Sequence, residues 1–142
     1  MSKEYTLNIQ GYYLDVSRTQ FPALPAIFFV YKGTFNAENR TCVLKQLLYV
    51  GDADDLLQCA ATLDSRINLS STLDSDEAIF YTFSLDYSDP VIRKRIVDAL
   101  VYELRPSLIK FNPNAPKPAQ TTIIVSGNKH AFVPARIEAP SF

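Results

Sequence analysis

Alternating and continuous apolar segments along the chain predict a set of strands. Residues 5–16 (YTLNIQGYYLDV) alternate on both sides of Gly11, which predicts either one strand with a bend or bulge there or two short strands. Residues 26–31 (AIFFVY) are a continuous apolar run too short for a helix, as is typical of a buried central strand. Residues 42–50 (CVLKQLLYV) predict an antiparallel partner, joined to it by a polar hairpin connection over residues 32–41.

Residues 54–67 carry apolar side chains at helical spacing, on one face: Leu56, Ala60, Leu63 and Ile67. The glycine before this helix, Gly51, predicts a tight turn out of the preceding strand. Asp52 or Asp54 can cap the helix by accepting hydrogen bonds from its first backbone N–H groups.

A second helix is predicted over residues 91–104, where Ser88-Asp89-Pro90 supplies an Asp cap and a proline at the first position. Pro106 ends this helix, and its inward positions are Ile92, Ile96, Ala99, Leu100 and Leu104. Between the helices, residues 78–87 alternate and are aromatic, which predicts another strand.

The last part of the chain predicts an extended, proline-containing connector over residues 111–120 and then a β-hairpin over residues 121–134. Residues 126–129 would form the turn of this hairpin, and residues 136–142 a tail. The whole pattern predicts a single α+β domain over residues 1–142. Its centre is a small antiparallel or mixed sheet flanked by helices, and the extra strands at its two ends could pair with each other at one edge.

Composition narrows the classes of function. The formal net charge is −1 over 142 residues, which argues against a broad basic surface for nucleic acid but not against a small basic groove. Cys42, Cys59 and His130 are too few for a four-ligand structural zinc site, and the two cysteines favour small core residues over a disulfide framework. With no apolar run long enough to span a membrane and no signal-peptide pattern, we expect a soluble, cytoplasmic protein without membrane partners.

The tripeptide Ala26-Ile27-Phe28, then Tyr49-Val50-Gly51 followed by Asp55-Leu56, then a late acid-bearing helix before Pro106, resemble the GIY-YIG endonuclease family. The resemblance covers residues 25–108, with strand-bearing extensions at 1–24 and 109–142. It implies a small antiparallel sheet with flanking helices, and metal-dependent phosphodiester hydrolysis as the ancestral chemistry.

The resemblance also implies a catalytic set: two tyrosines, an Arg on the helix after the second motif, and a metal-binding Glu on the later helix. Tyr49 matches the second tyrosine, and Asp98 aligns with the Glu. Phe28 stands at the first tyrosine and has no hydroxyl, while Cys59 stands at the Arg and cannot form a bidentate pair with phosphate. Phe28 and Cys59 are therefore vestigial positions under this comparison.

Substitutes are available in the sequence for three of these roles. Tyr31 and Tyr81 are nearby aromatic hydroxyls in predicted strands. Arg66 lies two turns beyond Cys59, and Glu103 is the next acid along the later helix, so a metal would bind Asp98 or Glu103 if activity remains. Asp98 has a second interpretation, an exposed helical ion pair with Lys94. Three carboxylates at residues 52–55 would also repel a DNA backbone near the first helix.

The densest basic run, Arg93-Lys94-Arg95, is a candidate phosphate-contact patch together with Arg66, or else a solvated helix face, which we favour. An exposed aromatic patch would instead indicate a protein partner or self-association, and its candidate members are Tyr12, Tyr13, Phe35, Tyr81 and Tyr87.

Three hypotheses follow. The favoured one is a GIY-YIG-like domain without nuclease activity and without a cofactor, acting as a binding or structural module. The second is a divergent endonuclease for DNA or RNA that uses Mg²⁺ or Mn²⁺ with Tyr49 and Asp98. The third is an assembly or inhibitor protein whose partner is another protein.

Overall fold

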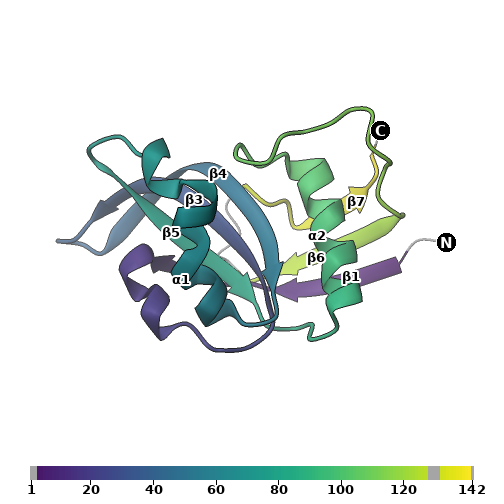
Figure 1. Ribbon diagram of the computed structural model, residues 1–142, viewed down its shortest axis with the longest axis horizontal. Helices are drawn as coiled ribbons and strands as arrows, with labels where there is room; N and C mark the ends of the chain where they lie inside the picture. Colours follow the sequence, from purple (N-terminus) through teal and green to yellow (C-terminus); the bar gives the residue numbers. More distant parts are fainter. Residues whose placement is uncertain (1–2, 128–131, 142) are drawn as a thin grey trace.

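A computed structural model describes residues 3–127 and 132–141 of the chain, in an α+β fold with two sheets (Figure 1). The larger sheet is antiparallel and has the strand order β2 (Gln10–Leu14), β5 (Glu77–Ser84), β3 (Ala26–Asn36), β4 (Thr41–Ala53). The smaller sheet has the order β1 (Lys3–Asn8), β6 (Thr121–Ser126), β7 (Arg136–Ala139). The helices are α1 (Leu56–Ile67), α2 (Pro90–Leu104) and the short 3-10 helices η1 (Asp15–Gln20) and η2 (Leu69–Thr72).

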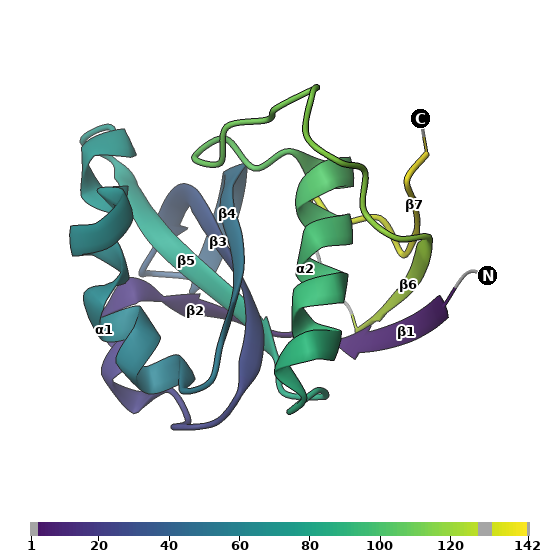
Figure 2. The same ribbon diagram turned by 45° about the vertical axis from the view of Figure 1, so that its right-hand side comes forward.

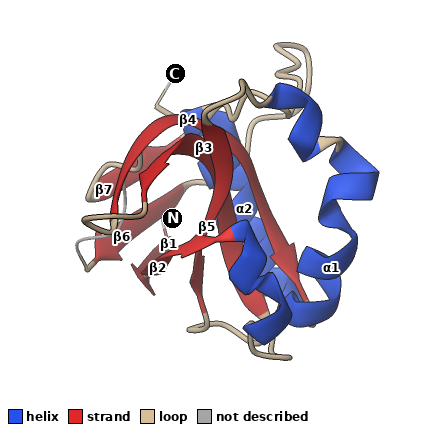
Figure 3. Ribbon diagram, turned by 90° about the vertical axis from the view of Figure 1, so that its left-hand side faces the viewer, coloured by secondary structure: helices blue, strands red, loops and turns tan. Residues whose placement is uncertain are grey.

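Strand β3 is central in the larger sheet, as the apolar run at residues 26–31 predicts. Its side chains alternate between two core clusters. Ile27 and Phe29 pack in the cluster that includes α2, while Phe28 and Val30 pack in the cluster that includes α1. The two helices lie on opposite sides of the sheet (Figure 3). Because both faces of β3 are covered, it has no polar face and shows no alternation in the sequence.

The segment predicted as a polar hairpin connection, residues 32–41, is mostly strand. Strands β3 and β4 stay paired as far as Asn36 and Thr41, so only residues 37–40 remain for the turn. Polar side chains are tolerated there because β5 pairs with β3 no further than Thr34, which leaves the end of the hairpin surrounded by solvent.

The predicted tight turn at Gly51 is also wrong. Strand β4 continues through Gly51 to Ala53, and α1 begins at Leu56. Neither Asp52 nor Asp54 caps this helix; the Asp55 carboxylate does, by accepting a hydrogen bond from the Gln58 N–H at 3.1 Å. The inward face of α1 is as predicted, with Leu56, Ala60 and Leu63 buried.

Helix α2 agrees with its sequence signals at both ends. The Asp89 side chain accepts from the Val91 N–H at 2.9 Å, and Pro90 is the first helical residue. The helix ends at Leu104, with Arg105 in the left-handed conformation and Pro106 after it. Ile96, Ala99 and Leu100 are fully buried. Among the described helices, none combines the length and the apolar character needed to cross a membrane.

The two ends of the chain do pair, since β1 runs parallel to β6, but they form a separate sheet and not an edge of the larger one. The predicted bend near Gly11 is present: β1 ends at Asn8, and β2 has an irregular register between Gln10 and Tyr13. The antiparallel partner of β6 is β7, within the predicted tail. The predicted second hairpin strand is thus wrong, and two residues of its predicted turn, Asn128 and Lys129, lie outside the described residues.

Candidate functional site

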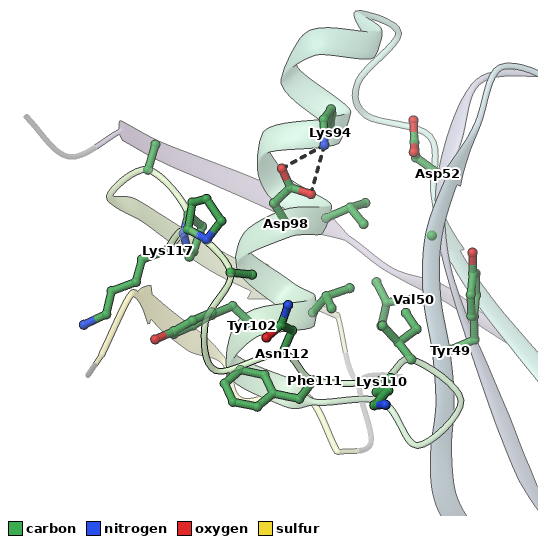
Figure 4. A pocket seen from close by; sticks show the side chains of 18 residues that line it. Tyr49, Val50, Asp52, Lys94, Asp98, Tyr102, Lys110, Phe111, Asn112 and Lys117 are labelled. Atoms are coloured by element: carbon green, nitrogen blue, oxygen red, sulfur yellow. Dashed lines mark hydrogen bonds and ion pairs between the residues drawn. The ribbon is translucent and has the colours of Figure 1, made fainter.

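A cleft with a volume of about 750 Å³ lies along the outer edge of β4. Figure 2 shows β4 running between α1 and α2. One wall of the cleft comes from β4, a second from the exposed side of α2, and a third from the connector over residues 109–119. The cleft contains Tyr49 and Asp98, the two positions that the resemblance names as catalytic (Figure 4).

Tyr49 and Asp98 enter this cleft from different sides of β4. Tyr49 packs with the cluster around α1, and its ring stacks on the buried Phe28 ring at a centroid distance of 5.9 Å. Asp98 comes from α2, on the other side of the strand. Gly51 makes the stack possible, because a Cβ there would lie 2.7 Å from Tyr49 Cε2 and 3.0 Å from Phe28 Cζ.

The Asp98 carboxylate forms an ion pair with a lysine of its own helix, α2. Lys94 Nζ lies 3.1 Å from Asp98 Oδ2, which confirms the predicted ion pair one turn apart (Figure 4). Both side chains are largely exposed, so the pair is a weak surface interaction. Over residues 3–127 and 132–141, no three His, Cys, Asp or Glu side chains gather closely enough to hold a metal ion.

Arg93 does not lie on a solvated helix face, contrary to the interpretation of the basic run, since its side chain is only 1% exposed. It points from the start of α2 toward the end of β4. Its Nε donates to Asp52 Oδ2 at 3.2 Å, its Nη1 to the Ser88 carbonyl, and its Nη2 to Asp54. The two carboxylates predicted to cap α1 thus neutralise a buried guanidinium instead.

Two further candidate residues of α2, Arg95 and Glu103, contact other parts of the chain and not the β4 cleft. Arg95 Nε donates to Thr121 Oγ1 at 3.1 Å, which fastens α2 to the start of β6. Glu103 accepts a hydrogen bond from the Ser141 N–H at 3.0 Å, near the end of the described chain. Neither side chain lines the β4 cleft.

Cys59 and Arg66 line a shallower hollow on α1, beside Asp54 and Asp55. Arg66 Nη2 donates to Cys59 Sγ at 3.2 Å, so a guanidinium does reach the position where the resemblance expects one. Burial raises the pKa of the Cys59 thiol above its ordinary value, although the adjacent Arg66 acts in the opposite direction. The thiol is therefore a protonated packing group at neutral pH.

The connector wall of the cleft is a feature that the sequence analysis missed. It is held by Phe111, whose ring meets Tyr102 edge-on at 5.9 Å and lies 3.7 Å beneath the Arg105 guanidinium carbon. Lys110 and Lys117 are exposed on this wall, and no ion pair is recorded for either among the described residues. The sequence signal that could have indicated this wall is one lysine before the proline-containing segment, Lys110, and one within it, Lys117.

The predicted aromatic patch is only partly present. Phe35 is 41% exposed and lines a smaller concavity with Tyr12 and Tyr13, whereas Tyr81 is 1% exposed and belongs to the core. Tyr87 lies apart from this group, against β1, where it hydrogen-bonds to Thr6. His130 lies outside the described residues.

Comparison of the chain with protein-family models, curated proteins and solved structures gives no match. The chemistry of the site therefore rests on its own geometry. A cleft with aromatic rings, two unpaired lysines and a neutralised Asp98 can hold an anionic ligand, but it offers no metal-binding set.

Proposed function

We propose that the chain is a GIY-YIG-like binding module without nuclease activity, and that its ligand is a nucleic acid lying in the β4 cleft. The main support is Phe28, since no hydroxyl is present at the first tyrosine position to activate or position an attacking water. The Lys94–Asp98 pair adds to this support, because the lysine ammonium competes with a metal ion for that carboxylate.

The proposed contact surface is the connector wall. Lys110 and Lys117 carry positive charge and have no carboxylate partner among the described residues, and the rings of Tyr102 and Phe111 lie at the same wall. Lysine side chains suit backbone phosphates, and aromatic rings suit the bases of a single strand. Because only two lysines are proposed to contact phosphates and the net charge is small, binding should be weak and should depend only shallowly on salt.

Binding is tested by fluorescence anisotropy with labelled single- and double-stranded DNA and RNA, at two salt concentrations. Lys117→Glu should weaken binding several-fold, whereas the matched change Lys3→Glu, on β1 and outside the cleft, should leave it nearly unchanged. Equal losses in the two variants would mean that only the overall charge matters, and no binding by the folded wild-type protein would contradict the proposal.

Nuclease activity is tested with the same oligonucleotides in the presence of Mg²⁺ or Mn²⁺. We expect no cleavage above a protein-free control. Cleavage by the wild-type protein that disappears in Asp98→Ala would overturn this part of the proposal and favour the divergent endonuclease.

That endonuclease is the second candidate, and two observations favour it. Tyr49 and Asp98 line one cleft, and the Arg66 guanidinium reaches Cys59. It requires Asp98 to exchange Lys94 for a metal ion. A crystal soaked in Mn²⁺ should then show a peak at Asp98 in anomalous maps, and an undisturbed Lys94–Asp98 pair in the soaked crystal would count against it.

A further inference from the structure

A smaller concavity, of about 590 Å³, lies on the larger sheet near the end of the β3–β4 hairpin, and we call it the hairpin concavity. The hairpin extends away from α2 (Figure 1). On the face of β3 that packs toward α2, Ile27, Phe29 and Tyr31 are buried, whereas Phe35, further along the same face, is 41% exposed. No described residue of α2 or of the smaller sheet lines the hairpin concavity, so this part of the face is open.

The floor of the hairpin concavity is apolar and held by packing. Phe80 on β5 is buried, and Tyr12 on β2 packs edge-on against the buried Tyr31 ring at a centroid distance of 6.1 Å. Leu14 and Phe35 add apolar surface around this floor. A preformed hollow lined mainly by apolar and aromatic side chains is typical of sites for small organic molecules.

The charged side chain at the hairpin concavity is Arg40, from the turn between β3 and β4. Arg40 has no carboxylate partner among residues 3–127 and 132–141, and none of the described residues that line the concavity is acidic. A guanidinium stays charged at physiological pH and can bind a carboxylate or a phosphate through two parallel hydrogen bonds. The concavity therefore combines an apolar floor with one available positive charge.

We propose that the hairpin concavity binds a small aromatic carboxylate, with its carboxylate on Arg40 and its ring on the floor formed by Tyr12 and Phe80. A carboxylate carries one negative charge, which one guanidinium neutralises. A phosphate monoester carries nearly two, and the second would lie beside an apolar floor without a partner. A ring suits this floor because aromatic pairs gain energy beyond the burial of their area.

The hairpin concavity and the β4 cleft share no lining residue, so this proposal does not depend on nucleic-acid binding. The chain also contains a reporter for each of two surfaces. Cys42 is a free thiol that lines the hairpin concavity, and Cys59 is a free thiol in the separate hollow on α1. A ligand in the hairpin concavity should cover Cys42 and leave Cys59 accessible.

The test measures the rate at which iodoacetamide modifies each cysteine, by peptide mass spectrometry, with 3-phenylpropionate as the probe. The probe should slow modification of Cys42 several-fold and saturably, and leave the rate at Cys59 unchanged. The uncharged 3-phenylpropan-1-ol and the doubly charged 2-phenylethyl phosphate should protect Cys42 much less. Relative to each variant without probe, Arg40→Gln should lose most of the protection, whereas Arg136→Gln, on β7 and outside the concavity, should keep it.

The remaining outcomes overturn the proposal. Equal protection by the alcohol, or protection that survives Arg40→Gln, would show that the guanidinium does not hold the ligand. Stronger protection by the phosphate would make the ligand a phosphate. Protection of Cys42 that rises with protein concentration in the absence of probe would show that a second copy covers the concavity. A wild-type protein with a folded circular dichroism spectrum and no protection by 3-phenylpropionate would show that the concavity does not bind this class of ligand.

Discussion

Arg93 differs from the two basic residues that follow it in how deeply its side chain is buried. Lys94 and Arg95 follow it directly, and only Arg93 is fully buried, with Asp52 and Asp54 as partners. Arg93→Met should lower the free energy of unfolding by about 2–3 kcal/mol, somewhat less than for a fully buried pair, because the exposed Asp54 can return to water. Urea titration measures the difference.

The matched control is Arg93→Lys, which keeps the charge but loses the planar fork that reaches both carboxylates and the Ser88 carbonyl. We expect the free energy of unfolding of Arg93→Lys to lie between those of the wild-type protein and Arg93→Met. If Arg93→Met were as stable as the wild-type protein, the buried ion pairs would contribute nothing beyond packing.

Gly51 is required by its neighbours and not by its backbone conformation. A Cβ would meet the Tyr49 and Phe28 rings, so Gly51→Ala should destabilise the protein by about 1–3 kcal/mol through displacement of the stacked rings. The cost should shrink when Tyr49 is replaced by alanine, because the closer ring is then gone. A thermodynamic cycle of the two single variants and the double variant measures this coupling, and strict additivity would rule out the steric explanation.

At the scale of elements, α2 carries two aspartates with different roles. Asp89→Ala removes the helix cap and should cost about 1 kcal/mol. Asp98→Ala removes only an exposed pair with Lys94 and should cost about 0.5 kcal/mol or less, with the difference fading at high salt. Thermal unfolding of both variants at low and high salt distinguishes them. A loss at Asp98 as large as that at Asp89 would indicate a role beyond the ion pair.

Local signals in the sequence were sufficient to predict most elements, including both α-helices, the central strand and its antiparallel partner. The failures came from partners far away in the chain. Asp52 and Asp54 looked like caps because their partner, Arg93, is about forty residues distant. Strand β6 was assigned the nearest downstream segment as its hairpin partner, whereas its antiparallel neighbour is β7.

Only part of the candidate site could be predicted from the sequence. Tyr49 and Asp98 line one cleft, whereas Phe28 is buried and Cys59 lines the separate hollow on α1. The connector wall was not foreseen, since its position depends on contacts of Phe111 with Tyr102 and Arg105 that have no periodic signal. Long-range packing of this kind leaves no pattern in a single sequence.

At the scale of the whole molecule, the larger sheet separates two core clusters, and each contains a buried tyrosine. Tyr31 lies in the cluster with α2, and Tyr81 in the cluster with α1. Burial raises the pKa of both hydroxyls well above the ordinary value. Each side of the sheet therefore favours the neutral form of its buried phenol.

This arrangement predicts a loss of stability at alkaline pH. Below about pH 10 the tyrosines are protonated in both the folded and the unfolded chain, and their contribution is fully present. Above that pH the unfolded chain releases protons that the folded chain retains, so the free energy of unfolding falls, by up to about 1.4 kcal/mol per pH unit for each tyrosine. Urea titrations from about pH 9 to pH 12 should show this fall. Tyr31→Phe should reduce its slope, and Tyr31→Phe/Tyr81→Phe should reduce it further, since phenylalanine cannot ionise. An unchanged slope in the double variant would show that the alkaline loss arises elsewhere and that the two clusters do not exclude the phenolate.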